Sequence, residues 1–348
     1  GTAITTGAQN TIVGKGAGAG ITTASGNVAV GYEALKLEDI YGYNVAVGFA
    51  ALKNQNADAI TYNVAVGYAA AEGGLSGRYN VAIGGEAMYT NQDGDNNTAV
   101  GYKAMKTFEA DTDGHGNNTA IGFEAMRDAT TGVNNTAVGS LALGDGTLTG
   151  DSNTAVGFSA GKSHTGATGT FIGAYSGFAN TSGTRNTFVG EGSGFTNSTG
   201  IRNTAVGASA LKLNVQGDQN VAVGTFALED FVADTDGHGQ NTAVGYAAMA
   251  EATTGTHNTV LGSNAMSAAQ VTGDNNIVIG YGAGSAMTSA ATNVVIGSFA
   301  SDALTEGIRN VAIGYNALST EDTSDGNIAI GNSALFTQSA ADDARNVA

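Results

Sequence analysis

A short block that recurs along the chain constrains the fold more than any other feature. The block is Asn-[Thr/Val]-Ala-[Val/Ile]-Gly or a close variant, most often 17 residues after the previous one, with spacings of 16, 18, 19 and 21 as well. Gly169 takes the place of the asparagine once, which gives nineteen coils. The remaining coils begin at Asn10, Asn27, Asn44, Asn63, Asn80, Asn97, Asn118, Asn135, Asn153, Asn186, Asn203, Asn220, Asn241, Asn258, Asn276, Asn293, Asn310 and Asn327. Repeats of this length stack into solenoids. We predict an all-β fold, a parallel β-solenoid of about nineteen 16–21-residue coils that runs as one continuous array over residues 1–348.

The residue types at each coil position predict how a coil is built. With the asparagine counted as position 0, position 3 is Val, Ile or Leu in all nineteen coils, and position 1 is Thr or Val except for Ile277 and Ile328. Residues two apart in a strand share a face, and β-branched residues suit a buried one. We therefore expect positions 1 and 3 to face the core, with stacked threonine hydroxyls bonding one another. The asparagines should form an amide ladder along the stack.

Position 4 is glycine in every coil, which predicts a corner with positive φ. An aromatic residue follows in many coils, and position 7 is alanine in seventeen coils and serine in two, Ser176 and Ser193. Each coil should thus contain two short strands, Asn-Thr-Ala-Val and Tyr-x-Ala-Leu, joined at the glycine and closed by a polar turn. All length changes between coils fall in that turn.

A second, longer repeat is superimposed on the repeat of single coils. The segment 110–116, Ala-Asp-Thr-Asp-Gly-His-Gly, recurs as 233–239, seven coils later, which indicates duplication of a seven-coil block. Coils stacked at the strand spacing of ~4.8 Å would give nineteen coils a length of roughly 90 Å. Residues 345–348 begin another coil, so we expect the chain to be a piece of a longer fibre.

Charge and composition exclude some partners. Thirteen basic residues against thirty acidic ones give a formal net charge of −17, which removes the main source of affinity for nucleic acids. The chain has no cysteine, and it has no apolar run long enough to span a membrane. We therefore expect no nucleic-acid partner and no membrane-spanning segment in these residues.

Residues 44–51, Asn-Val-Ala-Val-Gly-Phe-Ala-Ala, and their equivalents in the other coils resemble the head repeats of trimeric autotransporter adhesins, the YadA-like head. Similar arrays occur in phage tail fibres. The resemblance implies a left-handed parallel β-roll, assembly as a homotrimer, and an extracellular fibre or adhesin shaft on a cell or virion. Its partner would be a host or cell-surface glycan or protein receptor.

The family's repeat is usually shorter and opens with serine instead of asparagine. Alanine ladders at positions 2 and 7 would let another chain approach closely.

The duplicated segment is the candidate metal site. Asp111 and Asp113, with their copies Asp234 and Asp236, have the Asp-x-Asp-Gly pattern of calcium loops. Two carboxylates and turn carbonyls suit a hard cation, but the further ligands of an EF-hand loop are missing. Solvated acidic turns and calcium sites therefore both remain open. We expect no other cofactor.

No other motif predicts a site. Residues 157–163 end like a phosphate-binding loop but have three residues between the glycines where four are needed. His115, His164, His238 and His257 have no zinc spacing, and we interpret each as a solvated loop residue. No pattern of nucleophile and base is visible, so we expect no enzymatic activity.

Two other functions compete with the adhesive fibre. An ice-binding solenoid needs a flat, exposed threonine array, whereas position 1 contains valine in seven coils and is expected to face inward. A fibre-mounted glycan depolymerase needs converging carboxylates, which could also form between chains. Ice-recrystallisation and oligosaccharide-release assays would distinguish these functions.

Overall fold

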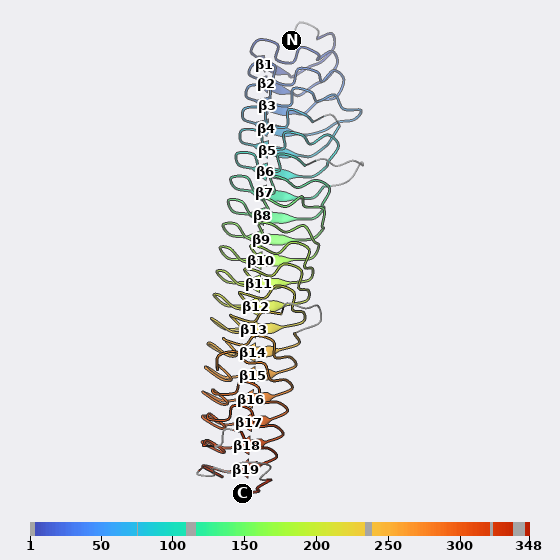
Figure 1. The fold of residues 1–348 in the computed structure, drawn as a ribbon. Helices are drawn as coiled ribbons and strands as arrows, with labels where there is room; N and C mark the ends of the chain where they lie inside the picture. Colours follow the sequence, from blue (N-terminus) through green and yellow to red (C-terminus); the bar gives the residue numbers. More distant parts are fainter. Residues whose placement is uncertain (1–3, 75, 109–115, 234–238, 321–322, 337–344) are drawn as a thin grey trace. The chain divides into compact units, whose positions relative to one another are not determined.

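The computed structural model describes residues 4–74, 76–108, 116–233, 239–320, 323–336 and 345–348. It forms two compact units, Gly1–Gly169 and Thr170–Ala348. Each unit is a parallel β-solenoid in which every coil contributes one strand (Figure 1). The described residues contain no helix, and thus none that could cross a membrane. The predicted all-β parallel solenoid is confirmed, and the described residues contain nineteen strands, one in each predicted coil.

Unit 1 contains the strands of coils 1 to 9, each three residues long and paired with the next coil in parallel. Alanine pairs with alanine through most of the stack, as Ala46 does with Ala65. The strands are β1 (Thr11–Val13), β2 (Val28–Val30), β3 (Val45–Val47), β4 (Val64–Val66), β5 (Val81–Ile83), β6 (Thr98–Val100), β7 (Thr119–Ile121), β8 (Thr136–Val138) and β9 (Thr154–Val156).

Unit 2 contains coils 10 to 19 and follows the same rule. The strands are β10 (Thr170–Ile172), β11 (Thr187–Val189), β12 (Thr204–Val206), β13 (Val221–Val223), β14 (Thr242–Val244), β15 (Thr259–Leu261), β16 (Ile277–Ile279), β17 (Val294–Ile296), β18 (Val311–Ile313) and β19 (Ile328–Ile330). Their registers keep each coil position in one column, as in Ala205 opposite Ala222.

The glycine at position 4 ends every strand. Gly207 has a φ of 137°, a conformation that L side chains rarely adopt. A Cβ added there would also lie 2.6 Å from the carbonyl carbon and oxygen of Gly224 in the next coil. The corner therefore needs glycine both for its backbone angle and for the close approach of the neighbouring coil, as the repeat predicts.

The segment after the corner is not a strand, and the prediction of a second strand per coil is wrong. In coil 2, positions 6 and 8 are Glu33 and Leu35, with φ values of 53° and 48°. A β-strand needs negative φ near −120°, so these left-handed residues make the segment a series of turns. Hydrogen bonds still connect the coils here, for example from the Leu35 amide to the Ala51 carbonyl at 2.9 Å.

The prediction that positions 1 and 3 face the core is also wrong. Position 2 points inward: Ala46 and Ala65 are fully buried, whereas the residues on either side of them are partly exposed. The interior of so short a coil accepts only a small side chain at this point. The alanines of position 7, such as Ala51, are buried inside the coil too. The alanines of positions 2 and 7 therefore pack inside the coil and keep it thin. They do not form the surface for close approach of another chain that the repeat led us to expect.

Larger side chains complete the core from position 8, which is Leu or Met in most coils. Coils 10 and 11 reverse the arrangement: Phe171 and Phe188 occupy position 2, and Gly177 and Gly194 occupy position 8. Both phenylalanines are fully buried, and side chains at the two glycines would overlap their rings. Core volume is thus conserved within a coil by exchanging the large and small positions.

The asparagines of position 0 form the expected ladder, with a more specific geometry. The Asn203 side-chain oxygen accepts from the backbone amide of Asn220 at 2.9 Å, and its Nδ2 donates to the Gly217 carbonyl at 2.7 Å. Contacts between the amide side chains themselves occur in only some coils, as from Asn276 to Asn258 at 3.0 Å. Asn203 thus joins the closing turn of its own coil to the start of the following strand. Among the described residues, the Nδ2 atoms of Asn27, Asn44, Asn97 and Asn327 have no such partner.

Candidate binding surface

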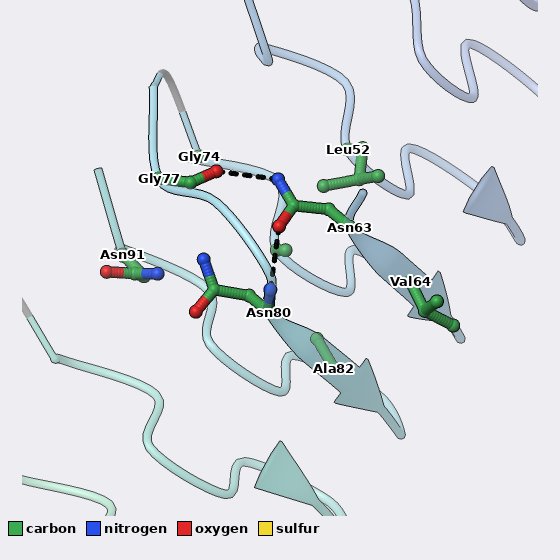
Figure 2. A pocket seen from close by; sticks show the side chains of 9 residues that line it. Leu52, Asn63, Val64, Gly74, Gly77, Asn80, Ala82 and Asn91 are labelled. Atoms are coloured by element: carbon green, nitrogen blue, oxygen red, sulfur yellow. Dashed lines mark hydrogen bonds between the residues drawn. The ribbon is translucent and has the colours of Figure 1, made fainter. Parts of the chain in front are cut away.

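The cavity inside coils 4 and 5 of unit 1 is too small to hold a substrate. A hollow of about 10 Å³ lies in coils 4 and 5, where Gly74 leaves space beside Asn63, Asn80 and Asn91. Figure 2 shows Asn63 bridging it, with Nδ2 donating to the Gly77 carbonyl at 2.7 Å and Oδ1 accepting from the Asn80 amide at 2.8 Å. A volume of this size matches a single water molecule.

The outer surface of the strands is the main apolar feature of each unit. We call the side chains of positions 1 and 3 the strand face. Position 3 carries Val, Ile or Leu throughout, and several of these side chains are well exposed, such as Val13 at 58% and Leu261 at 48%. The strand face therefore presents an unbroken column of apolar side chains along each unit.

Two aromatic columns flank the strands of unit 1, one after β2 to β4 and one before β3 to β5. At position 5, Tyr32, Phe49 and Tyr68 stack with ring centroids 5.0 and 5.4 Å apart. At position −1, immediately before the asparagine, Tyr43, Tyr62 and Tyr79 stack at 5.4 and 5.8 Å. All six side chains are between 41% and 59% exposed.

These stacks bear on whether the aromatic rings bind sugars. Neighbouring rings within each column are nearly parallel, with interplanar angles of 13° to 21°. A ring that stacks on its neighbours has its faces covered, and a sugar needs a free face. What these columns offer to a partner is mainly ring edges and tyrosine hydroxyls.

Threonine hydroxyls form the polar component of the strand face. Position 1 is threonine in β6 to β9 of unit 1, at Thr98, Thr119, Thr136 and Thr154. The side chains are partly exposed, and within the described residues their hydroxyls have no hydrogen bond to protein. The expected inward ladder of bonded threonine hydroxyls is therefore absent from these coils, because position 1 faces outward.

The candidate calcium ligands Asp111, Asp113, Asp234 and Asp236 lie outside the described residues. The rest of the chain, over its described ranges, contains no group of three His, Asp or Glu side chains that could hold a metal ion. Calcium binding by the duplicated loops stays a prediction. Stabilisation by millimolar calcium beyond that of sodium chloride at equal ionic strength would support it.

The geometry of the coil accounts for residues 157–163, the segment that ends like a phosphate-binding loop. Gly157 is a corner glycine and Gly161 occupies position 8, with φ values of 139° and 56°. The Lys162 ammonium pairs with the Asp145 carboxylate of the preceding coil at 2.9 Å. Coil geometry and an ion pair therefore account for these residues.

The histidine prediction is wrong for His164, which is fully buried. Its Nε2 lies 3.0 Å from the Asn153 side-chain oxygen. The residue takes position 11 of its coil, an inward position that Asn180 and Asn197 occupy in the following coils. Counting positions from the asparagine would have placed it inside. His257 is exposed, as expected, and His115 and His238 lie outside the described residues.

Position 11 also creates a buried polar cluster that the sequence analysis missed. Glu38 is fully buried in coil 2, and its carboxylate accepts from Gln55 Nε2 and from the Tyr41 amide, both at 3.1 Å. Gln55 Nε2 also donates to the Thr61 hydroxyl at 2.8 Å. Burial raises the pKa of Glu38 above its ordinary value. The cluster fills the coil interior and has no opening for a ligand among the described contacts.

Comparison with known proteins adds no relatives: no family model and no curated protein matches the chain. The structure shows a parallel β-solenoid. The relation to YadA-like or tail-fibre proteins rests on the resemblance of the repeat alone.

Proposed function

We propose that the chain is an extracellular structural fibre or adhesin shaft, assembled as a homotrimer, which attaches a virion or cell to a surface through a glycan or protein receptor. The observation that carries this proposal is the exposed apolar strand face of both units. The resemblance of the repeat supplies the trimer, the left-handed coil and the extracellular setting.

A continuous apolar column is costly to leave in water. Full burial of one Val, Leu or Ile side chain contributes about 1.5–3 kcal/mol, and position 3 repeats such a residue in every coil. Large contiguous apolar patches are rare on monomeric soluble proteins and often mark sites of interaction with other chains. A second and third copy of the same face would cover it, and rotational symmetry gives each copy an identical share of the contact.

The inward side of each coil supports a mechanical role. The buried positions are filled by alanine, asparagine and position 8 side chains, and adjacent coils are joined by hydrogen bonds along the whole turn. Each coil is stabilised mainly by its neighbours, which is the energetics of a solenoid. Such a unit can be lengthened by copying coils, which suits a shaft.

Lysines placed on the strand face test the proposal. The double variant Val100→Lys with Ile121→Lys puts two charges on β6 and β7, and we expect it to run as a monomer in light scattering. The matched control Asn56→Lys with Gln92→Lys adds the same charge at exposed residues outside the strands and should stay trimeric. Equal masses for both variants would contradict burial of the strand face. Glycan-array binding by the trimer and the monomeric variant would test attachment.

One observation favours a second candidate function, ice binding. Position 1 faces outward, and in four successive coils of unit 1 its threonine hydroxyls make no hydrogen bond to any part of the chain that the structure describes. Valine interrupts the array in β2 to β5. The two functions are mutually exclusive on this surface, because a trimer buries the hydroxyls. Inhibition of ice recrystallisation by the wild-type chain, lost on Thr119→Leu with Thr136→Leu, would support ice binding. No inhibition would exclude it.

A further inference from the structure

The strand face has two edges. One edge is position −1, before the buried asparagine, and the other is position 5, after the corner glycine. In coils 3 and 4 both edges are aromatic: Tyr43 and Phe49 flank β3, and Tyr62 and Tyr68 flank β4. We infer that these edges form the seam between neighbouring chains, with position −1 of one chain packed against position 5 of the next. The inference rests on the homotrimer proposed above.

Symmetry determines which edges meet. When three copies are related by three-fold rotation about an axis parallel to the stack, every contact is heterologous: one edge of a chain meets the opposite edge of the next. Rotation without translation also keeps equal coil numbers at equal height. Tyr62 of one chain therefore lies beside Tyr68 of its neighbour, and Tyr43 lies beside Phe49. A two-fold axis perpendicular to the stack would instead pair each edge with itself.

The aromatic columns fit such a seam. Stacking within a column covers the ring faces and leaves edges outward, and the exposed fractions of Tyr62 and Tyr68 are 48% and 59%. An aromatic edge that meets a second aromatic column makes tilted or edge-to-face contacts, which contribute about 0.5–1.5 kcal/mol beyond area burial. The columns occur in successive coils of one stretch, so the contacts add along the seam.

One pair of opposite charges in unit 2 independently supports the pairing of position −1 with position 5. In coil 11, position −1 is Arg185 and position 5 is Glu191, and both are exposed. Neither side chain has an ion pair within the described residues, although the chain is strongly acidic. The strand β11 separates the two within a chain. At a heterologous seam the guanidinium of one chain meets the carboxylate of the next.

Cysteine cross-linking tests the seam directly, since the chain has no cysteine of its own. The double variant Tyr62→Cys with Tyr68→Cys, oxidised with copper phenanthroline, should give covalent dimers and trimers on a denaturing gel. Each single variant is the matched control and should stay monomeric on that gel. A disulfide within one chain leaves the mass unchanged, so only contacts between chains are counted. Cross-linked dimers from the single variants would overturn the inference, because they would show that each edge meets the same edge of another chain.

The unmodified chain provides a second measurement if the cysteines disturb assembly. Photo-oxidation joins tyrosines in contact, and peptide mapping should find a Tyr62–Tyr68 cross-link between chains. Cross-links confined to Tyr43–Tyr62 and Tyr62–Tyr79, which are neighbours within a column, would contradict the seam.

A charge exchange tests the seam in unit 2. Arg185→Glu should lower the trimer fraction at low salt, and adding Glu191→Arg should restore it. A loss that the second substitution does not restore would count against the pairing.

The outcomes of these tests can be told apart from failure of the proposed function. A wild-type monomer refutes the trimer itself, whereas a wild-type trimer without these cross-links refutes only the seam.

Discussion

At the scale of single residues, the corner glycine has the clearest physical requirement. We predict that Gly207→Val lowers the unfolding temperature, because its φ of 137° is strained for a β-branched residue and its Cβ would contact the Gly224 carbonyl. The strain alone costs on the order of 1–3 kcal/mol. Thermal unfolding of Gly207→Val and of Gly85→Val checks this. Gly85 has no positive φ and occupies position 5, where other coils have large side chains. Equal melting of the two variants would contradict the account.

The buried carboxyl of Glu38 predicts a pH dependence of stability. Burial, with a smaller contribution from Asp39, raises its pKa in the folded chain. The folded state thus holds the proton more tightly than the unfolded state, so the stabilisation is complete below the unfolded pKa of about 4.3 and is lost as pH rises through the folded pKa.

Glu38→Gln removes this titration. We expect the difference in unfolding temperature, variant minus wild type, to be larger at pH 7 than at pH 4, because the wild type loses stability as Glu38 ionises. Titrations elsewhere in the chain are common to both proteins and cancel in the difference. A difference that does not change with pH would show that Glu38 has the same pKa in both states.

At the scale of the strand and coil, the repeat predicted much of the fold. The block fixes where each strand starts and where it ends, because glycine follows position 3 in every coil. The inward side was assigned incorrectly because β-branched residues at positions 1 and 3 resemble a buried face. The asparagine ladder contained the correcting signal: positions 0 and 2 share a face, so a buried Asn203 requires a buried Ala205.

The second segment of the coil and the candidate site were harder to predict. Left-handed φ values at residues such as Leu35 and Met88 are set by contacts with the neighbouring coils, which local propensity does not contain. The polar cluster around Glu38 was missed because its position lies in the part of the coil where length varies, so the residue was not aligned with its equivalents.

Exchange of core volume within a coil gives a double-mutant test. Phe188→Ala should destabilise by about 3–5 kcal/mol, because it empties a fully buried position. Adding Gly194→Leu should restore most of that loss, since it recreates the alanine and leucine pair of coils such as coil 2, where Leu35 has a φ of 48° close to the 57° of Gly194. Gly194→Leu alone should destabilise, because its side chain would overlap the Phe188 ring. Denaturant unfolding of the three variants and wild type measures the coupling, and additive effects would contradict it.

At the scale of the whole molecule, charge opposes the proposed assembly. A trimer carries three times the formal charge of −17, so repulsion should weaken it at low ionic strength. We predict that the trimer fraction rises with sodium chloride between about 10 and 150 mM, because the screening length falls from roughly 30 to 8 Å over that range. Sedimentation at several salt concentrations checks this. A trimer fraction that falls with salt would indicate that attractive ion pairs, and not the strand face, dominate the contact.

The central claim is that the strand face is covered by further copies of the chain. The most direct test is the mass of the wild-type chain in solution by light scattering at physiological salt. The account predicts three times the chain mass of 34.4 kDa, and a single species of 34.4 kDa across the accessible concentration range would contradict it.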